Sequence, residues 1–258
     1  MHDPRWRLDG QTALVTGASV GIGRAIAREL LGLGAELLLV AREEAALDQA
    51  REELSEEFPQ QRVLTFAADL GDAEQRAEVF DWVTDLGTGL NILVNNVGGN
   101  TPKLALDYLP EDWQRLFELN VFCAFDLSRR AHPFLREHPA SAIVNIGSVS
   151  GATHVRTGAV YGMSKAALHQ MTRNLACEWG EDGIRVNAVL PWYIRTRRTS
   201  TPLADPEYFD AVIERTPLRR IGEPEEVAAV VAFLCLPAAG YVTGECMAVD
   251  GGFLRFGF

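Results

Sequence analysis

The chain of 258 residues and 28.3 kDa is long enough for one large domain with a sizeable buried core. Its hydrophobic content of 47% is ordinary for a globular protein and excludes the disordered and fibrous classes. A formal net charge of -11 argues against a nucleic-acid partner, because proteins that bind the phosphate backbone need a basic footprint.

The chain also lacks the sequence patterns of secretion, membrane insertion and metal binding. The first seven residues contain no apolar secretion signal, and no apolar run reaches the roughly 18 residues that span a bilayer. The four cysteines (Cys123, Cys177, Cys235 and Cys246) form no CxxC pair, and the five histidines form no HExxH pattern. We therefore expect a cytoplasmic protein with reduced cysteines, no metal site and no membrane partner.

Apolar runs typical of strands alternate with helical patterns along the whole chain. In chain order we expect a strand at 12–16, a helix at 23–33, a strand at 36–41, a helix at 43–58, a strand at 62–67, a helix at 72–86, a strand at 92–94, a helical region after 110, a strand at 142–146, a helix at 161–180, a strand at 185–190, a helix at 223–236 and a strand at 245–249. Near-continuous apolar strands separated by helices predict a parallel sheet, because right-handed crossovers place helices on both of its faces. The fold class is therefore α/β: a single-domain doubly wound (Rossmann) parallel sheet of about seven strands over residues 1–258.

One segment, 192–220, interrupts this alternation and is rich in Thr, Pro and Arg. It is a long connection after the carboxyl end of a strand, where doubly wound folds bind ligands and carry mobile loops. We expect it to form a lid over the substrate.

A glycine-rich turn lies between the first strand and the first helix. The sequence Gly17-Ala18-Ser19-Val20-Gly21-Ile22-Gly23 has the spacing GxxxGxG rather than GxGxxG. Glycines at such a turn let the backbone approach a pyrophosphate, which then lies against the partial positive charge of the helix N-terminus. The turn predicts a dinucleotide site formed by the residues Gly17, Ser19, Val20, Gly21, Ile22 and Gly23.

The same residues also satisfy GxSxG, the nucleophile elbow of α/β-hydrolases, with Ser19 as nucleophile. This alternative is disfavoured because the elbow normally follows a middle strand, and Ser19 follows the first. The histidines that would complete a triad, His154 and His169, lack a recognisable acidic partner in the sequence.

The end of the second strand carries Ala41 and Arg42, where dinucleotide folds often place an acidic residue for the ribose 2′-hydroxyl. A neutral side chain beside a guanidinium suits a 2′-phosphate instead. We predict NADP(H) as the cofactor. The alternative is that Arg42 is a solvated residue and that Glu43 or Glu44 serves the ribose of NAD(H).

Tyr161 and Lys165 are four residues apart on an expected helix and therefore project from the same face. A nearby ammonium favours the tyrosinate, so we expect the pKa of Tyr161 to be lowered towards neutrality. Such a phenol is a general acid/base for a carbonyl oxygen. Ser148 stands thirteen positions earlier, after the strand at 142–146.

These residues, together with Asn95-Asn96-Val97-Gly98 and Asn120, occur in the order of the short-chain dehydrogenase/reductase family, which the chain resembles over its whole length. The second half resembles the tropinone-reductase-like branch in four motifs: 174–179 (NLACEW), 191–194 (PWYI), 216–220 (TPLRR) and 250–253 (DGGF).

The resemblance implies a role for each matching position. Ser148 would bind the substrate carbonyl and Tyr161 would donate its proton. Lys165 would hold the nicotinamide ribose, and Asn120 would anchor a water. The other cofactor contacts implied are Asp69 and Leu70 at the adenine, Asn96 and Gly98 alongside the cofactor, and Pro191, Ile194 and Thr196 at the nicotinamide.

The candidate substrate residues lie after strand ends and in the lid. They are Gly99, Asn100, Thr153, His154, Val155, Trp192, Tyr193, Ile194, Leu203, Tyr208, Phe209 and Val212. Because they are apolar and aromatic with few charges, they predict a small neutral ketone or secondary alcohol. His154 is either a ligand to a polar group of the substrate or a solvated loop residue.

The helix at 161–180 carries a second apolar face with Leu168, Met171 and Leu175. The resemblance implies that such helices pair between subunits, so we expect a homodimer or homotetramer. The alternative is burial of this face within the chain. A non-catalytic dinucleotide sensor on the same fold is a further alternative, but it would lack Ser148, Tyr161 or Lys165, and all three are present.

Overall fold

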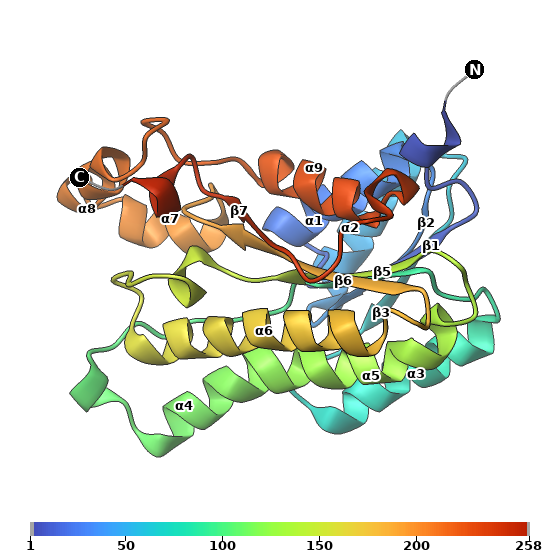
Figure 1. Cartoon of the computed structure of the whole chain (residues 1–258), viewed down its shortest axis with the longest axis horizontal. Coiled ribbons are helices and arrows are strands. Elements are labelled where there is room, and N and C mark those ends of the chain that lie inside the picture. The colour runs from blue at the N-terminus through green and yellow to red at the C-terminus, as the bar shows by residue number, and fades with distance from the viewer. Residues whose placement is uncertain (1–2, 257–258) are drawn as a thin grey trace.

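The computed structural model describes residues 3–256, and its centre is a seven-stranded parallel sheet in the order β3-β2-β1-β4-β5-β6-β7 (Figure 1). The strands are β1 (Thr12–Thr16), β2 (Glu36–Ala41), β3 (Val63–Ala67), β4 (Ile92–Asn95), β5 (Ser141–Ile146), β6 (Ile184–Pro191) and β7 (Cys246–Val249). Every strand pair is parallel. The doubly wound fold predicted from the sequence is confirmed.

The strand order reverses at β1, which lies between β2 and β4. The connections that leave the carboxyl ends of β1 and β4 therefore diverge, and a crevice opens between them. The segments that follow these strands, at 17–23 and 96–100, meet at this crevice. It is the expected position of a ligand site in an open α/β sheet.

Helices cover both faces of the sheet (Figure 1). One face carries α1 (Gly21–Gly32), α2 (Glu44–Glu57) and α9 (Pro224–Cys235), and the other carries α3 (Ala73–Leu86), α5 (Cys123–Leu135) and α6 (Ala159–Glu178). The helix α4 (Pro110–Phe117) continues into α5 through a π-helical turn at Glu118–Phe122. Across residues 3–256, none of the helices combines the length and the apolar composition that a bilayer crossing requires.

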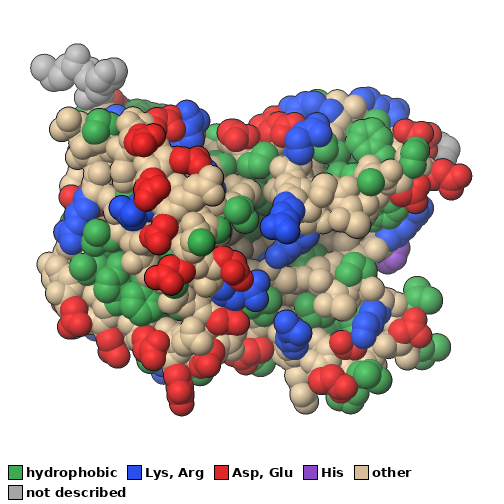
Figure 2. Space-filling view, turned by 180° about the vertical axis from the view of Figure 1, so that it is seen from behind, with side chains coloured by type: hydrophobic (Ala, Val, Ile, Leu, Met, Phe, Trp, Pro, Cys, Tyr) green, Lys and Arg blue, Asp and Glu red, His purple; other side chains and the backbone are tan. Residues whose placement is uncertain are grey.

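The segment 192–220 contains two short helices, α7 (Arg197–Leu203) and α8 (Pro206–Glu214), that were not predicted. In Figure 2, which views the molecule from the side opposite to Figure 1, the surface is hollowed beneath this segment. Lys and Arg side chains gather along the hollow, whereas Asp and Glu predominate on the other side of the view.

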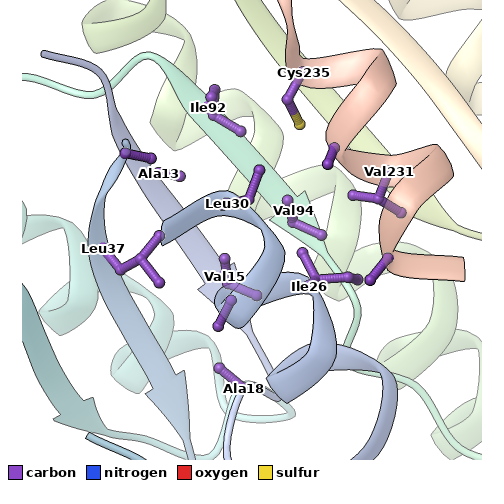
Figure 3. Packing of buried hydrophobic residues seen from close by; sticks show 14 of the residues in the cluster. Ala13, Val15, Ala18, Ile26, Leu30, Leu37, Ile92, Val94, Val231 and Cys235 are labelled. Atoms are coloured by element: carbon purple, nitrogen blue, oxygen red, sulfur yellow. The ribbon is translucent and has the colours of Figure 1, made fainter. Parts of the chain in front are cut away.

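The core between the sheet and the α1/α9 layer explains the apolar spacing of α1 (Figure 3). Ile26 and Leu30 are one helical turn apart and contribute to the same buried cluster as Val15 and Val94 of the sheet and Val231 of α9. Each is 0% exposed. Burial of one such aliphatic side chain stabilises the fold by about 1.5–3 kcal/mol, so this layer fixes the position of the α1 N-terminus.

On the opposite face of the sheet, the second apolar face of α6 is buried within the chain. Leu168 and Leu175 are buried, and Leu175 belongs to the cluster formed with α3, α5 and the sheet, against which Met171 packs. The predicted subunit-pairing face is therefore packed within the chain itself, which was the alternative.

Candidate active site

Tyr161 and Lys165 lie on the first turns of α6, as predicted. The Lys165 ammonium stands 5.9 Å from the centroid of the Tyr161 ring. Its Nζ donates a hydrogen bond of 2.7 Å to the Ile146 carbonyl at the end of β5. The lysine is only 4% exposed, so the side chain is held under the carboxyl edge of the sheet.

The predicted lowering of the Tyr161 pKa is wrong in this structure. Burial raises the pKa of Tyr161, and the opposing effects of the Ser148 hydroxyl and the Arg198 cation are smaller. Burial, assisted by the Arg198 charge, lowers the pKa of Lys165 to about 7. Desolvation therefore dominates the ionisation of both groups and favours their neutral forms.

Ser148 follows β5 with an extended backbone and is 8% exposed. Its Oγ accepts a hydrogen bond from the Ser150 N–H at 3.2 Å and thereby caps a short 3-10 turn, Val149–Gly151. Its hydroxyl also lies close enough to the Tyr161 phenol to oppose the rise in the pKa of Tyr161. The structure therefore brings the two hydroxyl groups together.

His169 is a residue of this site that the sequence prediction considered only as a histidine of the disfavoured hydrolase triad. Its Nε2 accepts a hydrogen bond from the Ser148 N–H at 3.4 Å, and the ring is 3% exposed. Burial lowers the pKa of His169 to about 4, with smaller effects from the Lys165 and Arg173 charges. The missed signal is spacing: Tyr161, Lys165 and His169 are successive positions four residues apart on one helix.

Asn120 lies in the π-helical turn between α4 and α5 and is 1% exposed. Its Oδ1 accepts from the Gly99 N–H at 2.8 Å, and its Nδ2 donates to the Gly99 carbonyl at 2.9 Å and to Ser164 Oγ at 3.0 Å. A Cβ at Gly98 would lie 2.9 Å from Asn120 Oδ1 and 3.3 Å from Lys165 Nζ. Asn120 therefore fixes the loop after β4 against α6.

The glycine turn is closed against the loop after β4. Gly17 and Gly21 have φ values of +63° and +58°, which favour glycine. The side-chain amide of Asn96 donates to the Thr16 carbonyl at 2.9 Å and to the Gly17 carbonyl at 3.2 Å. A Cβ at Gly23 would lie 2.2 Å from the Gly17 oxygen, so no other residue fits this turn without a backbone shift.

The remaining residues of this turn differ in burial, since Ala18 is buried and Ile22 packs against the same hydrophobic cluster. Val20 is 58% exposed, and Ser19 and Ile22 are partly buried. Within residues 3–256, no hydrogen bond joins Ser19 to a histidine, so the hydrolase alternative gains no support from the geometry. The first N–H groups of α1, which begins at Gly21, have no partner within the helix, as at any helix N-terminus.

Three further residues predicted to bind the cofactor lie along the strand ends. Arg42 is exposed after β2, and no ion pair joins it to a carboxylate in the described part of the chain. Asp69 is exposed after β3 and accepts from the Gly71 N–H at 3.0 Å. The neighbouring Leu70 is buried.

The segment 192–220 approaches the crevice from the other side. Pro191 ends β6, and Ile194 pairs with Gly222 in a parallel bridge. Thr196 lies opposite the glycine turn, since its Cγ2 would be 3.5 Å from a Cβ at Gly21. Arg198 Nη2 donates a hydrogen bond of 2.7 Å to the Gly98 carbonyl. Arg198 was not predicted, because the contact joins residues a hundred positions apart.

Aromatic side chains form the base of this segment. Trp192 stacks on Phe253 with centroids 3.8 Å apart, and its Nε1 donates to Thr216 Oγ1 at 3.0 Å. The hydroxyls of Tyr193 and Tyr208 form a short hydrogen bond. Burial raises the pKa of Tyr193, so this phenol stays neutral. Leu203, Phe209 and Val212 belong to the same aromatic cluster.

Two adjoining cavities of about 740 and 340 Å³ lie beside the catalytic candidates. Of the predicted substrate residues, His154 and Val155 line both cavities, Thr153 the larger one, and Trp192, Tyr193, Tyr208 and Val212 the smaller one. Gly99, Asn100, Ile194, Leu203 and Phe209 line neither. The walls also contain three cationic residues that the sequence prediction did not name: Lys103, Arg156 and Arg215.

A doubly wound parallel sheet with a glycine turn after β1, and with Ser148, Tyr161 and Lys165 gathered at the adjacent strand ends, defines a nucleotide-dependent oxidoreductase. Residues 17–254 match the family model described as Enoyl-(Acyl carrier protein) reductase. The chain belongs to the short-chain dehydrogenase/reductase family, in its tropinone-reductase-like branch.

Curated relatives and solved structures extend over nearly the whole chain. A tropinone reductase homolog of Arabidopsis thaliana is 44% identical over 99% of this chain and 97% of its own length. Senescence-associated protein 13 of Arabidopsis thaliana is 44% identical over 100% of this chain and 95% of its own. L-Sorbose reductase from Gluconobacter frateurii, solved with NADPH and L-sorbose, has a TM-score of 0.91 and 33% identity and covers 98% of this chain and 99% of its own. The Pseudomonas aeruginosa RhlG/NADP complex has a TM-score of 0.91 and 35% identity over the same shares.

Proposed function

We propose that this chain is an NADP(H)-dependent oxidoreductase that interconverts a carbonyl group and a secondary alcohol on a small substrate, working as a ketone reductase. The observation that carries the proposal is the meeting of the Ser148 and Tyr161 hydroxyls above the buried Lys165, beside the glycine turn. A carbonyl oxygen between the two hydroxyls has two donors aimed at the position where negative charge develops.

The residues of the crevice fit a dinucleotide. The turn of Gly17–Gly23 leaves no room for a Cβ at Gly23, and the N-terminus of α1 that follows is suited to a pyrophosphate. Asp69, Leu70, Asn96 and Gly98 line its course, and Pro191, Ile194 and Thr196 lie at the nicotinamide end. The structures of L-sorbose reductase with NADPH and of RhlG with NADP support the same class of cofactor here.

Arg42 is the basis for choosing NADP(H). A guanidinium without a carboxylate partner among residues 3–256, next to the small Ala41, is suited to a 2′-phosphate. An acidic residue at position 41 would instead repel it.

The bound dinucleotide supplies the hydride in the reductive direction. As the carbonyl carbon accepts it, the π-electron pair moves to the carbonyl oxygen, which Ser148 stabilises by a hydrogen bond. Tyr161 transfers its phenolic proton to that oxygen, leaving a tyrosinate. Lys165 in its charged form stabilises the tyrosinate and binds the ribose, and Asn120 holds the adjoining loop and a water that leads to solvent.

Substrate entry involves the lid at 192–220. We propose that the segment opens and closes over the cavities lined by His154, Val155, Trp192 and Tyr193, with Phe209 packed behind them. The chain works as one catalytic domain over 1–258, of which residues 1–2 and 257–258 lie outside the described part.

The active unit is a homodimer or homotetramer in this proposal. Trp113, Phe122, Phe125 and Met163 are 40–58% exposed and lie on α4, the π-helical turn, α5 and α6. Neighbouring exposed apolar side chains of this kind suit contact with a second copy.

The proposal is tested by following nicotinamide absorbance with a panel of ketones and secondary alcohols, once with NADPH and once with NADH. We expect turnover with a higher kcat/KM for NADPH, and Ala41→Asp should shift the preference towards NADH. Equal catalytic efficiency with the two cofactors would defeat the assignment of Arg42, and no turnover across the panel would favour a non-catalytic sensor.

A further inference from the structure

The walls of the two cavities have the opposite charge to the rest of the molecule. The chain contains 35 acidic and 24 basic residues, yet no Asp or Glu lines either cavity. The polar part of the walls consists instead of Lys103, His154, Arg156 and Arg215 with a few hydroxyl groups.

Two of these cations are available to a ligand. Lys103 forms an ion pair of 2.5 Å with Asp112. Arg156 and Arg215, by contrast, form no ion pair with a carboxylate in the described part of the chain. Both line the smaller cavity, and Arg156 lines both.

The two arginines are held by different elements. Arg156 belongs to the loop between β5 and α6, and its charge acts on the Tyr193 phenol at the base of the smaller cavity. Arg215 caps the C-terminus of α8, where the helix dipole favours a cation, and lies 5.7 Å from the centroid of the Phe256 ring. The sequence separates them by 59 positions, and the fold brings them to one cavity.

The cavity between them has flat apolar walls. Trp192 is stacked on Phe253, and the Tyr193 ring packs edge-on against Trp192 with ring centroids 4.6 Å apart. The larger cavity lies next to the reaction centre: its walls include Ser150, whose N–H is bonded to Ser148 Oγ, and Gly162, which follows Tyr161, although Ser148 and Tyr161 themselves do not line it. A ligand that reaches from this cavity into the smaller one approaches the two guanidinium groups.

Building on the function proposed above, we propose that the substrate carries an anionic group, a carboxylate or a phosphate, which Arg156 and Arg215 bind in the smaller cavity while its carbonyl faces Tyr161 and Ser148. Guanidinium groups bind both kinds of oxyanion through paired hydrogen bonds. The same charges repel a substrate with a protonated amine. The neutral substrate predicted from the sequence is replaced by an anionic one.

Matched substrates test this inference. Benzoylformate is compared with its methyl ester, and dihydroxyacetone phosphate with dihydroxyacetone, in the wild type, Arg156→Gln and Arg215→Gln. We expect a lower KM for each anion than for its neutral partner. A preference for benzoylformate would indicate a carboxylate substrate, and a preference for dihydroxyacetone phosphate would indicate a phosphate substrate. Each substitution should raise KM for the preferred anion by about tenfold or more, since hydrogen bonds to charged groups are strong, and leave the neutral partner unchanged. Arg62→Gln, an exposed arginine outside both cavities, is the control and should change neither.

Binding without turnover separates the two proposals. Benzoate and benzamide are titrated by calorimetry against the wild type and the two cavity variants. If the wild type binds benzoate more tightly than benzamide, and Arg156→Gln weakens the binding of benzoate, the anion subsite is supported. This holds even if no carbonyl is reduced, and then only the proposed function fails. Equal affinity for benzoate and benzamide, or equal KM for acid and ester in every variant, overturns the subsite and leaves the reductase function intact.

Discussion

Tyr161, Lys165 and His169 occupy one stripe of α6, and burial affects the ionisation of all three. Desolvation favours the neutral form of each group: the phenol keeps its proton, while the lysine and the histidine lose theirs more easily. A neutral phenol is the form needed to donate a proton to a carbonyl oxygen. In the proposed mechanism, the raised pKa of Tyr161 therefore suits reduction, whereas oxidation would need a charged Lys165 to stabilise the tyrosinate.

The buried His169 predicts a pH dependence of stability. Its pKa is lowered from 6.5 to about 4 in the folded protein, so between these values the unfolded chain binds more protons than the folded one. The free energy of unfolding must then fall as the pH drops from about 6.5 towards 4. Denaturant titrations at pH 7 and pH 5 should show a smaller loss in His169→Leu than in the wild type, and equal losses would contradict this assignment.

His169 also positions Ser148 through the hydrogen bond that it accepts from the Ser148 N–H. Because the neutral ring accepts at Nε2, its proton must be on Nδ1. His169→Leu should lower kcat with little change in KM, whereas His169→Gln, which keeps an acceptor, should restore much of it. If Leu and Gln reduce kcat equally while both variants fold, His169 serves packing alone.

At the scale of elements, the glycine turn and α1 form one unit. Gly23→Ala should weaken NADPH binding by at least about tenfold, because its Cβ would lie 2.2 Å from the Gly17 oxygen and the turn must shift. The control is Gly32→Ala on the same helix, where a Cβ meets Phe58 at an ordinary 3.8 Å. That change should stabilise the protein by up to about 1 kcal/mol and leave cofactor affinity unchanged. Wild-type affinity in Gly23→Ala would show that the turn does not cradle the cofactor.

The sequence predicts some elements well because burial leaves a local pattern. The apolar runs of β1 and β5 and the four-residue spacing of Ile26 and Leu30 indicate strand and helix directly. The helices α7 and α8 were missed because they are short, and α7 contains Pro202 and no buried residue.

The residues of the candidate site can be predicted from the sequence only where they form local motifs. Motifs within a few residues of one another, such as the glycine turn and the pair Tyr161 and Lys165, can be recognised in the sequence. The contact of Arg198 with Gly98 and the position of Arg156 and Arg215 on the wall of one cavity arise only when distant loops assemble. The shift in the pKa of Tyr161 depends on desolvation, which spacing does not reveal.

At the scale of the whole molecule, exposed apolar side chains lie along α4 and α5, away from the α6 positions that are packed in the core. Light scattering should give the mass of a dimer or a tetramer. Phe125→Asp should shift the equilibrium towards the monomer because it places a charge in an apolar contact, whereas Phe125→Leu should not. A monomeric wild type would contradict the proposed dimer or tetramer.

The central claim is that Tyr161 delivers the proton that completes carbonyl reduction. It is tested most directly by turnover of Tyr161→Phe, followed through nicotinamide absorbance, together with titration of NADPH binding to the same variant. We expect turnover to fall by about 10²–10⁴-fold, the usual contribution of a positioned general acid, while NADPH affinity stays at the wild-type value because the aromatic ring is retained. Turnover near that of the wild type would contradict the mechanism.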